Sequence, residues 1–273
     1  MGRIGRGWQL AKVSLGVLNK DKEILLLPIL SGIFSVIVFG LIFIPGLLFY
    51  VFEETSDLFL FKSEEVSQLF LYLVYFLAYV AMTFVIVYFN AAVIGCARVR
   101  LEGGDPTLGD GFRIASKKLP HLFVWALISG TVGLVFRAFR KRMRLLSQLF
   151  EWAWGIVTFF VVPVILFENV SVTKSIGRSK DVITKTWGEA FVGRFGMGLL
   201  FILFGFLGLI FPIGGYFLYS MTGLAIGIIV ALIYWMLLLV IYSAANGVLT
   251  AALYRFASTG KIYPDYPAKL IQP

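Results

Sequence analysis

Long apolar runs alternate with short charged gaps along the whole of this 273-residue chain. The runs have about 17 to 30 residues, enough for a helix to cross a hydrocarbon core of ~30 Å. Hydrophobic residues make up 59% of the chain and charged residues 14%, whereas a soluble domain of this length needs a larger polar surface. The sequence therefore predicts an all-α fold, a polytopic transmembrane helical bundle.

Windows of about 19 residues predict six spans, at 24–52, 66–97, 119–136, 149–167, 195–219 and 221–254. We expect them to form three hairpins. A basic amphipathic helix should precede each hairpin, in the membrane plane on the cytoplasmic side, at 4–18, 107–118 and 172–187. In the first of these, one face carries Ile4, Trp8, Ala11, Leu15 and Leu18.

We expect one integral membrane domain over 1–273, with units at 1–100, 101–167 and 168–260 and a cytoplasmic tail at 261–273. The first apolar run begins beyond residue 23 and is too long for a secretory signal, so we expect the N-terminal segment to be retained.

Basic residues in short loops indicate the cytoplasmic face. They concentrate before the first span, after the second and after the fourth. The gap after the first span instead carries Lys62 against several carboxylates, namely Glu53, Glu54, Asp57, Glu64 and Glu65. We therefore expect that gap outside and both termini in the cytoplasm.

One gap conflicts with this orientation. If 119–136 and 149–167 both cross, a basic run lies outside, consisting of Arg137, Arg140, Lys141, Arg142 and Arg144. Either the two segments form a shallow re-entrant hairpin, or they cross and the run forms an interfacial amphipathic helix. Apolar residues spaced by three or four through the run favour the second alternative. The five cations are the candidate site for an anion or an anionic lipid headgroup.

Ionisable residues are nearly absent from the predicted spans, which argues against proton-coupled pumping. Asn90 and Asn246 are the most deeply placed amides. We expect both to face the bundle interior, either in interhelical hydrogen bonds or along a polar path. Each precedes small residues and then an arginine, an echo that would suit two related units running in the same sense.

No residue set specifies catalysis. His121 is the only histidine and Cys96 the only cysteine, which leaves neither a metal-ligand set nor a Ser/His/Asp set. Gly103-Gly104-Asp105 lacks the Lys and Ser/Thr of a phosphate loop, and the basic residues have no nucleic-acid reading module. We therefore expect no enzyme, no metal, no cofactor and no nucleic-acid partner.

Several blocks of the chain carry a resemblance to a known family. They are 97–111 (ARVRLEGGDPTLGDG), 125–129 (WALIS), 161–168 (VVPVILFE) and 185–189 (KTWGE). Together they resemble an uncharacterised family of prokaryotic integral membrane proteins, known as a domain of unknown function. The resemblance implies a multi-span inner-membrane protein of bacteria or archaea without an established activity. More loosely, the layout is similar to membrane domains attached to some glycerophosphodiesterases.

The leading interpretation is a non-enzymatic transport or permeation unit for a small solute or lipid, assembled as a homo-oligomer. The alternative is a structural or accessory subunit that binds anionic lipid or a protein partner through its cytoplasmic basic helices. A polar cavity reaching the middle of the bilayer would favour the first. A core closed by Phe and Leu would favour the second.

Overall fold

The computed structural model describes residues 3–55, 64–140, 142–185 and 187–260. The predicted tail, Lys141 and most of the loop predicted to lie outside the cell after the first span are not within these ranges. All elements in the described part are helical, which confirms the predicted class. They are α1 (Arg3–Lys20), η1 (Lys22–Leu25), α2 (Leu26–Thr55), α3 (Glu64–Leu101), α4 (Leu108–Ser116), α5 (Leu119–Arg140), α6 (Arg144–Val157), α7 (Val161–Phe167), α8 (Val172–Lys185), α9 (Trp187–Leu207) and α10 (Ile210–Thr259).

Five segments of the described chain are long and apolar enough to cross a membrane. They are Lys22–Phe52, Glu65–Leu101, Leu119–Arg140, Arg144–Phe167 and Gly196–Thr259. Their outer parts expose large apolar side chains such as Val36 and Phe217. Lipid contact would suit these surfaces, because the backbone polar groups are satisfied inside the helices.

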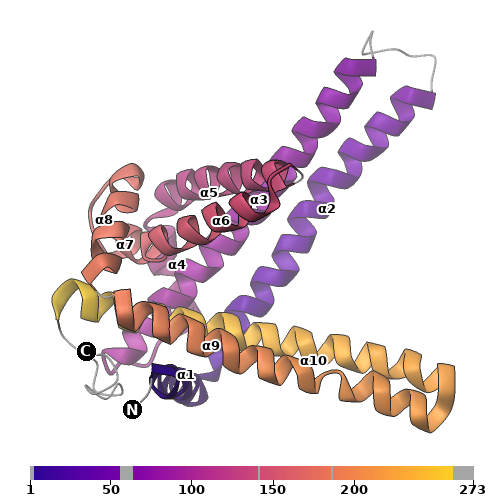
Figure 1. Ribbon diagram of the computed structural model, residues 1–273. Helices are drawn as coiled ribbons and strands as arrows, with labels where there is room; N and C mark the ends of the chain where they lie inside the picture. Colours follow the sequence, from indigo (N-terminus) through magenta and orange to yellow (C-terminus); the bar gives the residue numbers. More distant parts are fainter. Residues whose placement is uncertain (1–2, 56–63, 141, 186, 261–273) are drawn as a thin grey trace.

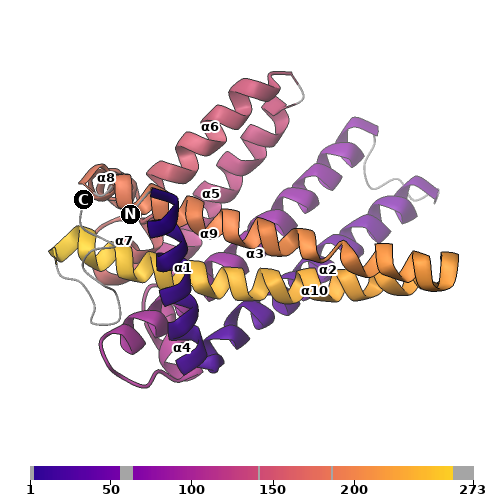
Figure 2. The same cartoon turned by 60° about the horizontal axis from the view of Figure 1, so that its bottom comes forward.

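The long helices leave a shared base in three directions (Figures 1 and 2). Helices α2 and α3 run side by side away from the base, and α5 with α6 forms a shorter pair against α3. Helices α9 and α10 point in a third direction. The short helices α1, α4, α7 and α8 lie at the base, where the C-terminal parts of α3 and α10 meet.

Helix α10 contains a reversal of the chain. Tyr219 (φ −138°, ψ 23°) and Ser220 (φ 53°, ψ −134°) leave the helical region, so residues 210–218 lie against the helix that begins after them. Gly215 and Gly223 face each other there, and a Cβ on either would overlap the carbonyl of the other. The reversal falls between the predicted segments 195–219 and 221–254, and gives Gly196–Thr259 two helical legs.

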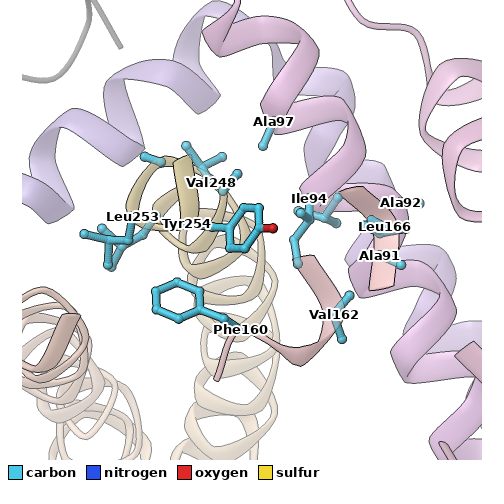
Figure 3. Close-up of a cluster of buried hydrophobic side chains, with 14 of the residues drawn as sticks. Ala91, Ala92, Ile94, Ala97, Phe160, Val162, Leu166, Val248, Leu253 and Tyr254 are labelled. Carbon is cyan, nitrogen blue, oxygen red and sulfur yellow. The ribbon is translucent and has the colours of Figure 1, made fainter. Parts of the chain in front are cut away.

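The buried core lies at the base, where α3 crosses α10. Alanines line the crossing on both helices, namely Ala91, Ala92 and Ala97 on α3 and Ala244, Ala245, Ala251 and Ala252 on α10. Small side chains let two helices approach closely. Figure 3 shows larger groups filling the space beside them, with Tyr254 next to Phe160 and with Ile94 opposite.

Helix α1 packs through a face that overlaps the predicted apolar face only in part. Leu10, Val17 and Leu18 are buried where α1 meets α9 and α10. Trp8 is 48% exposed, so it does not share the buried face with Leu18. Packing against neighbouring helices, which helical periodicity alone does not reveal, selects the buried side.

Candidate functional site

The two candidate amides lie at the crossing of α3 and α10. Asn90 and Asn246 are both half-buried. A Cβ on Gly247, the residue after Asn246, would overlap Val93 and lie 4.0 Å from Asn90 Oδ1, so Asn90 lies close to α10 at this point. Asn246 Oδ1 is buried and has no hydrogen-bond partner among the described residues. Its backbone carbonyl accepts from Thr250 Oγ1 at 2.7 Å.

The basic run forms the turn between α5 and α6. Arg140 ends α5, and Arg144 begins α6. Arg140 Nη2 donates to the two carboxylate oxygens of Glu151 at 2.6 and 2.7 Å. Ser147 Oγ donates to the Phe136 carbonyl at 2.8 Å. Because these contacts fold α6 back onto α5, the prediction that the basic run forms a helix is wrong. Its interfacial position stays a prediction.

Arg137 joins this turn to α3. Its Nη1 donates to Tyr75 Oη at 3.2 Å, and its guanidinium carbon lies 5.3 Å from the centre of the Tyr79 ring. Such a cation–π contact holds an arginine without neutralising it. The remaining described members of the run, Arg142 and Arg144, are exposed. Lys141 lies outside the described residues.

A polar pocket of about 470 Å³ opens at the base of the molecule. It lies between the C-terminal ends of α3 and α10 and the link from α7 to α8. Its lining combines arginines, carboxylates, hydroxyls and one phenylalanine, namely Arg98, Glu102, Phe167, Glu168, Arg178, Ala251, Tyr254, Arg255, Ser258 and Thr259. We call it the base pocket.

Glu168 links three elements on one side of the base pocket. It follows α7 in an extended conformation, which turns its carboxylate towards α8 and α10. Arg178 Nε lies 3.1 Å from each carboxylate oxygen. Tyr254 Oη donates to Oε1 at 2.7 Å. The carboxylate therefore fixes the positions of an arginine and a tyrosine from two different helices.

Glu102 is held less tightly, on the other side of the base pocket. Arg98 Nε donates to Glu102 Oε1 at 3.0 Å, and Arg255 Nη1 lies 3.9 Å from the same oxygen. The Arg98 guanidinium also stacks 4.3 Å from the centre of the Phe167 ring. Arg98 and Arg255 are the two arginines that follow Asn90 and Asn246 in the sequence. The structure brings both to one carboxylate.

Arg100 and Asp21 join α1 to the end of α3. Arg100 Nη2 donates to the Lys20 carbonyl at 2.9 Å, and its Nη1 donates to the Gly104 carbonyl at 3.2 Å. Asp21 is 6% exposed, and its Oδ2 lies 4.0 Å from Arg100 Nε. Burial raises the pKa of the Asp21 carboxyl, and the Arg100 charge opposes that rise only in part.

The distinctive block at 97–111 builds the connection from α3 to α4. Gly103 has a positive φ of 91° just after α3, a conformation that suits glycine. Thr107 and Asp110 form a reciprocal capping box at the start of α4. The Thr107 hydrogen bonds lower the pKa of Asp110. A Cβ on Gly111 would lie 2.5 Å from Cys96 Sγ, so α4 needs glycine there to reach α3.

The base pocket was not predicted from the sequence. Glu168 reads as an ordinary interfacial charge at the end of a span, and no spacing rule connects it with Arg178 and Tyr254. The one usable signal was the echo in which Asn90 and Asn246 are each followed by an arginine. Among the described residues, no group of three His, Cys, Asp or Glu side chains could hold a metal ion.

A protein family described as "Family of unknown function (DUF6159)" matches residues 69–263. The chain belongs to this family. The match includes every residue that lines the base pocket. No curated protein and no solved structure matches the chain significantly. The prokaryotic origin and the looser similarity to glycerophosphodiesterase-associated membrane domains stay predictions.

Proposed function

We propose that this protein is a non-enzymatic permeation unit that lets anionic lipids move between the two leaflets of a membrane. In this proposal the chain crosses six times, as three hairpins, with the base and both termini in the cytoplasm. The protein would reside in the inner membrane and assemble as a homo-oligomer. The loop charges support this orientation, and the exposed Trp8 suits an α1 that lies at headgroup level.

The observation that carries the proposal is the presence of cationic groups at both ends of α5. Arg137 and Arg140 lie at its outer end. At its inner end, Lys118 Nζ donates at 2.9 Å to Asn169 Oδ1, immediately beside the pocket residue Glu168. With 22 residues, α5 is about 33 Å long, close to the ~30 Å of a hydrocarbon core. Headgroups of either leaflet would therefore meet arginine or lysine.

Polar groups continue between these ends along α3. Tyr75, Tyr79 and Thr83 follow one another at four-residue spacing, and Asn90 falls on the same helical face. Helix α5 packs along this stripe, since a Cβ on Gly133 would lie 3.1 Å from Tyr79 Oη. The stripe carries hydroxyl and amide groups without charge, which favours passive movement over ion-coupled pumping.

A structural or accessory subunit is the second candidate. It is favoured by the crossing of α3 and α10, which alanines and larger apolar groups close tightly. The base pocket lies at the helix ends, below that closed core. On this alternative the exposed polar faces of α4 and α8 would dock a partner, and lipid would not pass.

A lipid-bleaching assay in reconstituted vesicles distinguishes the two candidate functions. Purified protein is inserted into phosphatidylcholine vesicles with a trace of fluorescent phosphatidylglycerol, and dithionite bleaches the outer leaflet. Permeation predicts bleaching well beyond the outer-leaflet half. It also predicts slower bleaching for Arg137→Gln than for Arg113→Gln, whose exposed side chain pairs with Asp110 within α4. Bleaching equal to that of protein-free vesicles would exclude lipid permeation and leave the accessory role.

A further inference from the structure

We propose that the base pocket binds a phosphate group, and that Glu102 occupies the position of this phosphate when the pocket is empty. The inference rests on the proposed function, because it names the ligand at the cytoplasmic end of the lipid route. It adds a specific exchange: the phosphate displaces the Glu102 carboxylate from Arg98 and Arg255.

The charge balance of the pocket favours an anion. Its lining contains the arginines Arg98, Arg178 and Arg255 against the carboxylates Glu102 and Glu168. Arginine binds phosphate through paired N–H donors in a planar fork. The arginines come from α3, α8 and α10, so an anion between them would contact three helices at once. At about 470 Å³ the pocket falls in the size range of small-molecule sites, and has room for more than a bare phosphate.

The two carboxylates are held differently. Glu168 receives Tyr254 Oη at 2.7 Å and both contacts from Arg178, and its side chain is 24% exposed. Glu102 receives Arg98 at 3.0 Å, lies 3.9 Å from Arg255 and is 43% exposed. Glu102 is therefore the carboxylate that an incoming phosphate can replace, whereas Glu168 keeps Arg178 and Tyr254 in position.

The Phe167 ring keeps Arg98 in place after such an exchange. The guanidinium stacks on the ring at 4.3 Å, a contact that does not involve Glu102. When the carboxylate swings away, the arginine therefore stays facing the pocket. Glu102 lies just beyond the end of α3, next to the Gly103–Gly104 turn, where the side chain can move towards solvent.

Phosphate at this site has two sources, a phospholipid headgroup of the inner leaflet or a soluble phosphate ester. Both are tested with the full-length protein in detergent, using the shift in melting temperature. One titration uses sodium phosphate and glycerol phosphate against matched sodium chloride. The other uses micelles containing phosphatidylglycerol against phosphatidylcholine alone. A shift with phosphatidylglycerol only assigns the headgroup, and a shift with the soluble probes assigns a free phosphate ester.

Three variants test the exchange. Arg98→Gln should lose most of the shift, and Lys180→Gln, on the exposed side of α8, should keep it. Glu102→Gln removes the competing carboxylate and should reach the same shift at a several-fold lower probe concentration. If Glu102 served only to hold Arg98 in position, Glu102→Gln would not lower the probe concentration needed for the shift. The proposal is overturned if no probe shifts the melting temperature, if Glu102→Gln binds more weakly than the wild type, or if Lys180→Gln loses as much as Arg98→Gln.

Binding and permeation can fail separately. If phosphatidylglycerol binds as expected but vesicles show no lipid movement, the assignment of the base pocket as a phosphate site is kept and the permeation function is rejected. If lipid moves while no phosphate probe binds, the assignment of the base pocket is rejected and the permeation function is kept.

Discussion

At the scale of single residues, contacts between backbone and neighbouring side chains decide where this chain tolerates a side chain. Gly109 and Gly111 both belong to α4, and because they are two residues apart they lie on different sides of the helix. A Cβ on Gly111 would lie 2.5 Å from Cys96 Sγ and 2.9 Å from the Ala92 carbonyl oxygen. A Cβ on Gly109 would meet only Thr107 Oγ1, at an ordinary 3.5 Å.

Gly111→Ala should therefore destabilise the fold, and Gly109→Ala should not. Forcing α4 away from α3 costs roughly 1–3 kcal/mol, as overpacking usually does. Alanine in place of an unhindered helical glycine adds up to about 1 kcal/mol of stability. Melting temperatures in one detergent measure both variants. Equal melting temperatures would show that α4 does not pack on α3 as closely as described.

Asp21 should make stability depend on pH. Burial raises the pKa of its carboxyl, so the folded protein favours the protonated form. The stability linked to that proton is fully present below the ordinary carboxyl pKa and is lost as the pH rises through the raised pKa. Asp21→Asn cannot ionise, so it should melt higher than the wild type at neutral pH and equally in acid. A lower melting temperature at neutral pH would mean that the Arg100 attraction outweighs burial.

At the scale of elements, helix α4 depends on Thr107, the residue that caps its N-terminus. Thr107 Oγ1 accepts from the Asp110 backbone N–H at 3.2 Å, which satisfies one free donor of the first turn. Thr107→Ala should cost about 1 kcal/mol. Thr184→Ala is the matched control, because that hydroxyl donates within its own helix α8. A smaller drop in melting temperature for Thr107→Ala than for Thr184→Ala would contradict the capping role.

Apolar periodicity and length were enough to predict the positions of the long helices. They did not predict the break between α6 and α7, where the sequence indicates one segment, 149–167. Ser179 of α8 donates to the Val157 carbonyl at 2.6 Å and accepts from the Phe160 N–H at 3.0 Å. The Ser179 side chain, which comes from α8, replaces helical hydrogen bonds of the α6–α7 backbone. No feature of the α6 sequence indicates this contact.

The base pocket was hidden for a related reason. Periodicity assigns residues to faces of their own helix, whereas the pocket joins the ends of α3 and α10 to the α7–α8 link. Arg98 and Arg255 share Glu102 although they lie far apart in the sequence. Recognising that convergence requires the crossing of α3 and α10, which depends on tertiary packing.

At the scale of the whole molecule, the helices differ in how closely their lengths match the thickness of a membrane. Helix α3 has 38 residues, about 57 Å at 1.5 Å per residue, nearly twice the ~30 Å of a hydrocarbon core. Long apolar helices adapt to a thinner bilayer by tilting. The divergence of the α2–α3 and α9–α10 pairs from one base (Figure 1) suits opposite tilts. Helix α5 can cross nearly upright.

The proposed passage of lipid requires α5 to cross the membrane fully, because only then would its two cationic ends lie in different leaflets. Single cysteines on a Cys96→Ser background test it, at the exposed positions Arg142 in the outer turn and Lys117 at the base. In intact cells, a membrane-impermeant thiol reagent should label Arg142→Cys and leave Lys117→Cys unlabelled until the cells are permeabilised. If both positions react only after permeabilisation, α5 and α6 form a re-entrant hairpin, and the account of lipid passage between leaflets is contradicted.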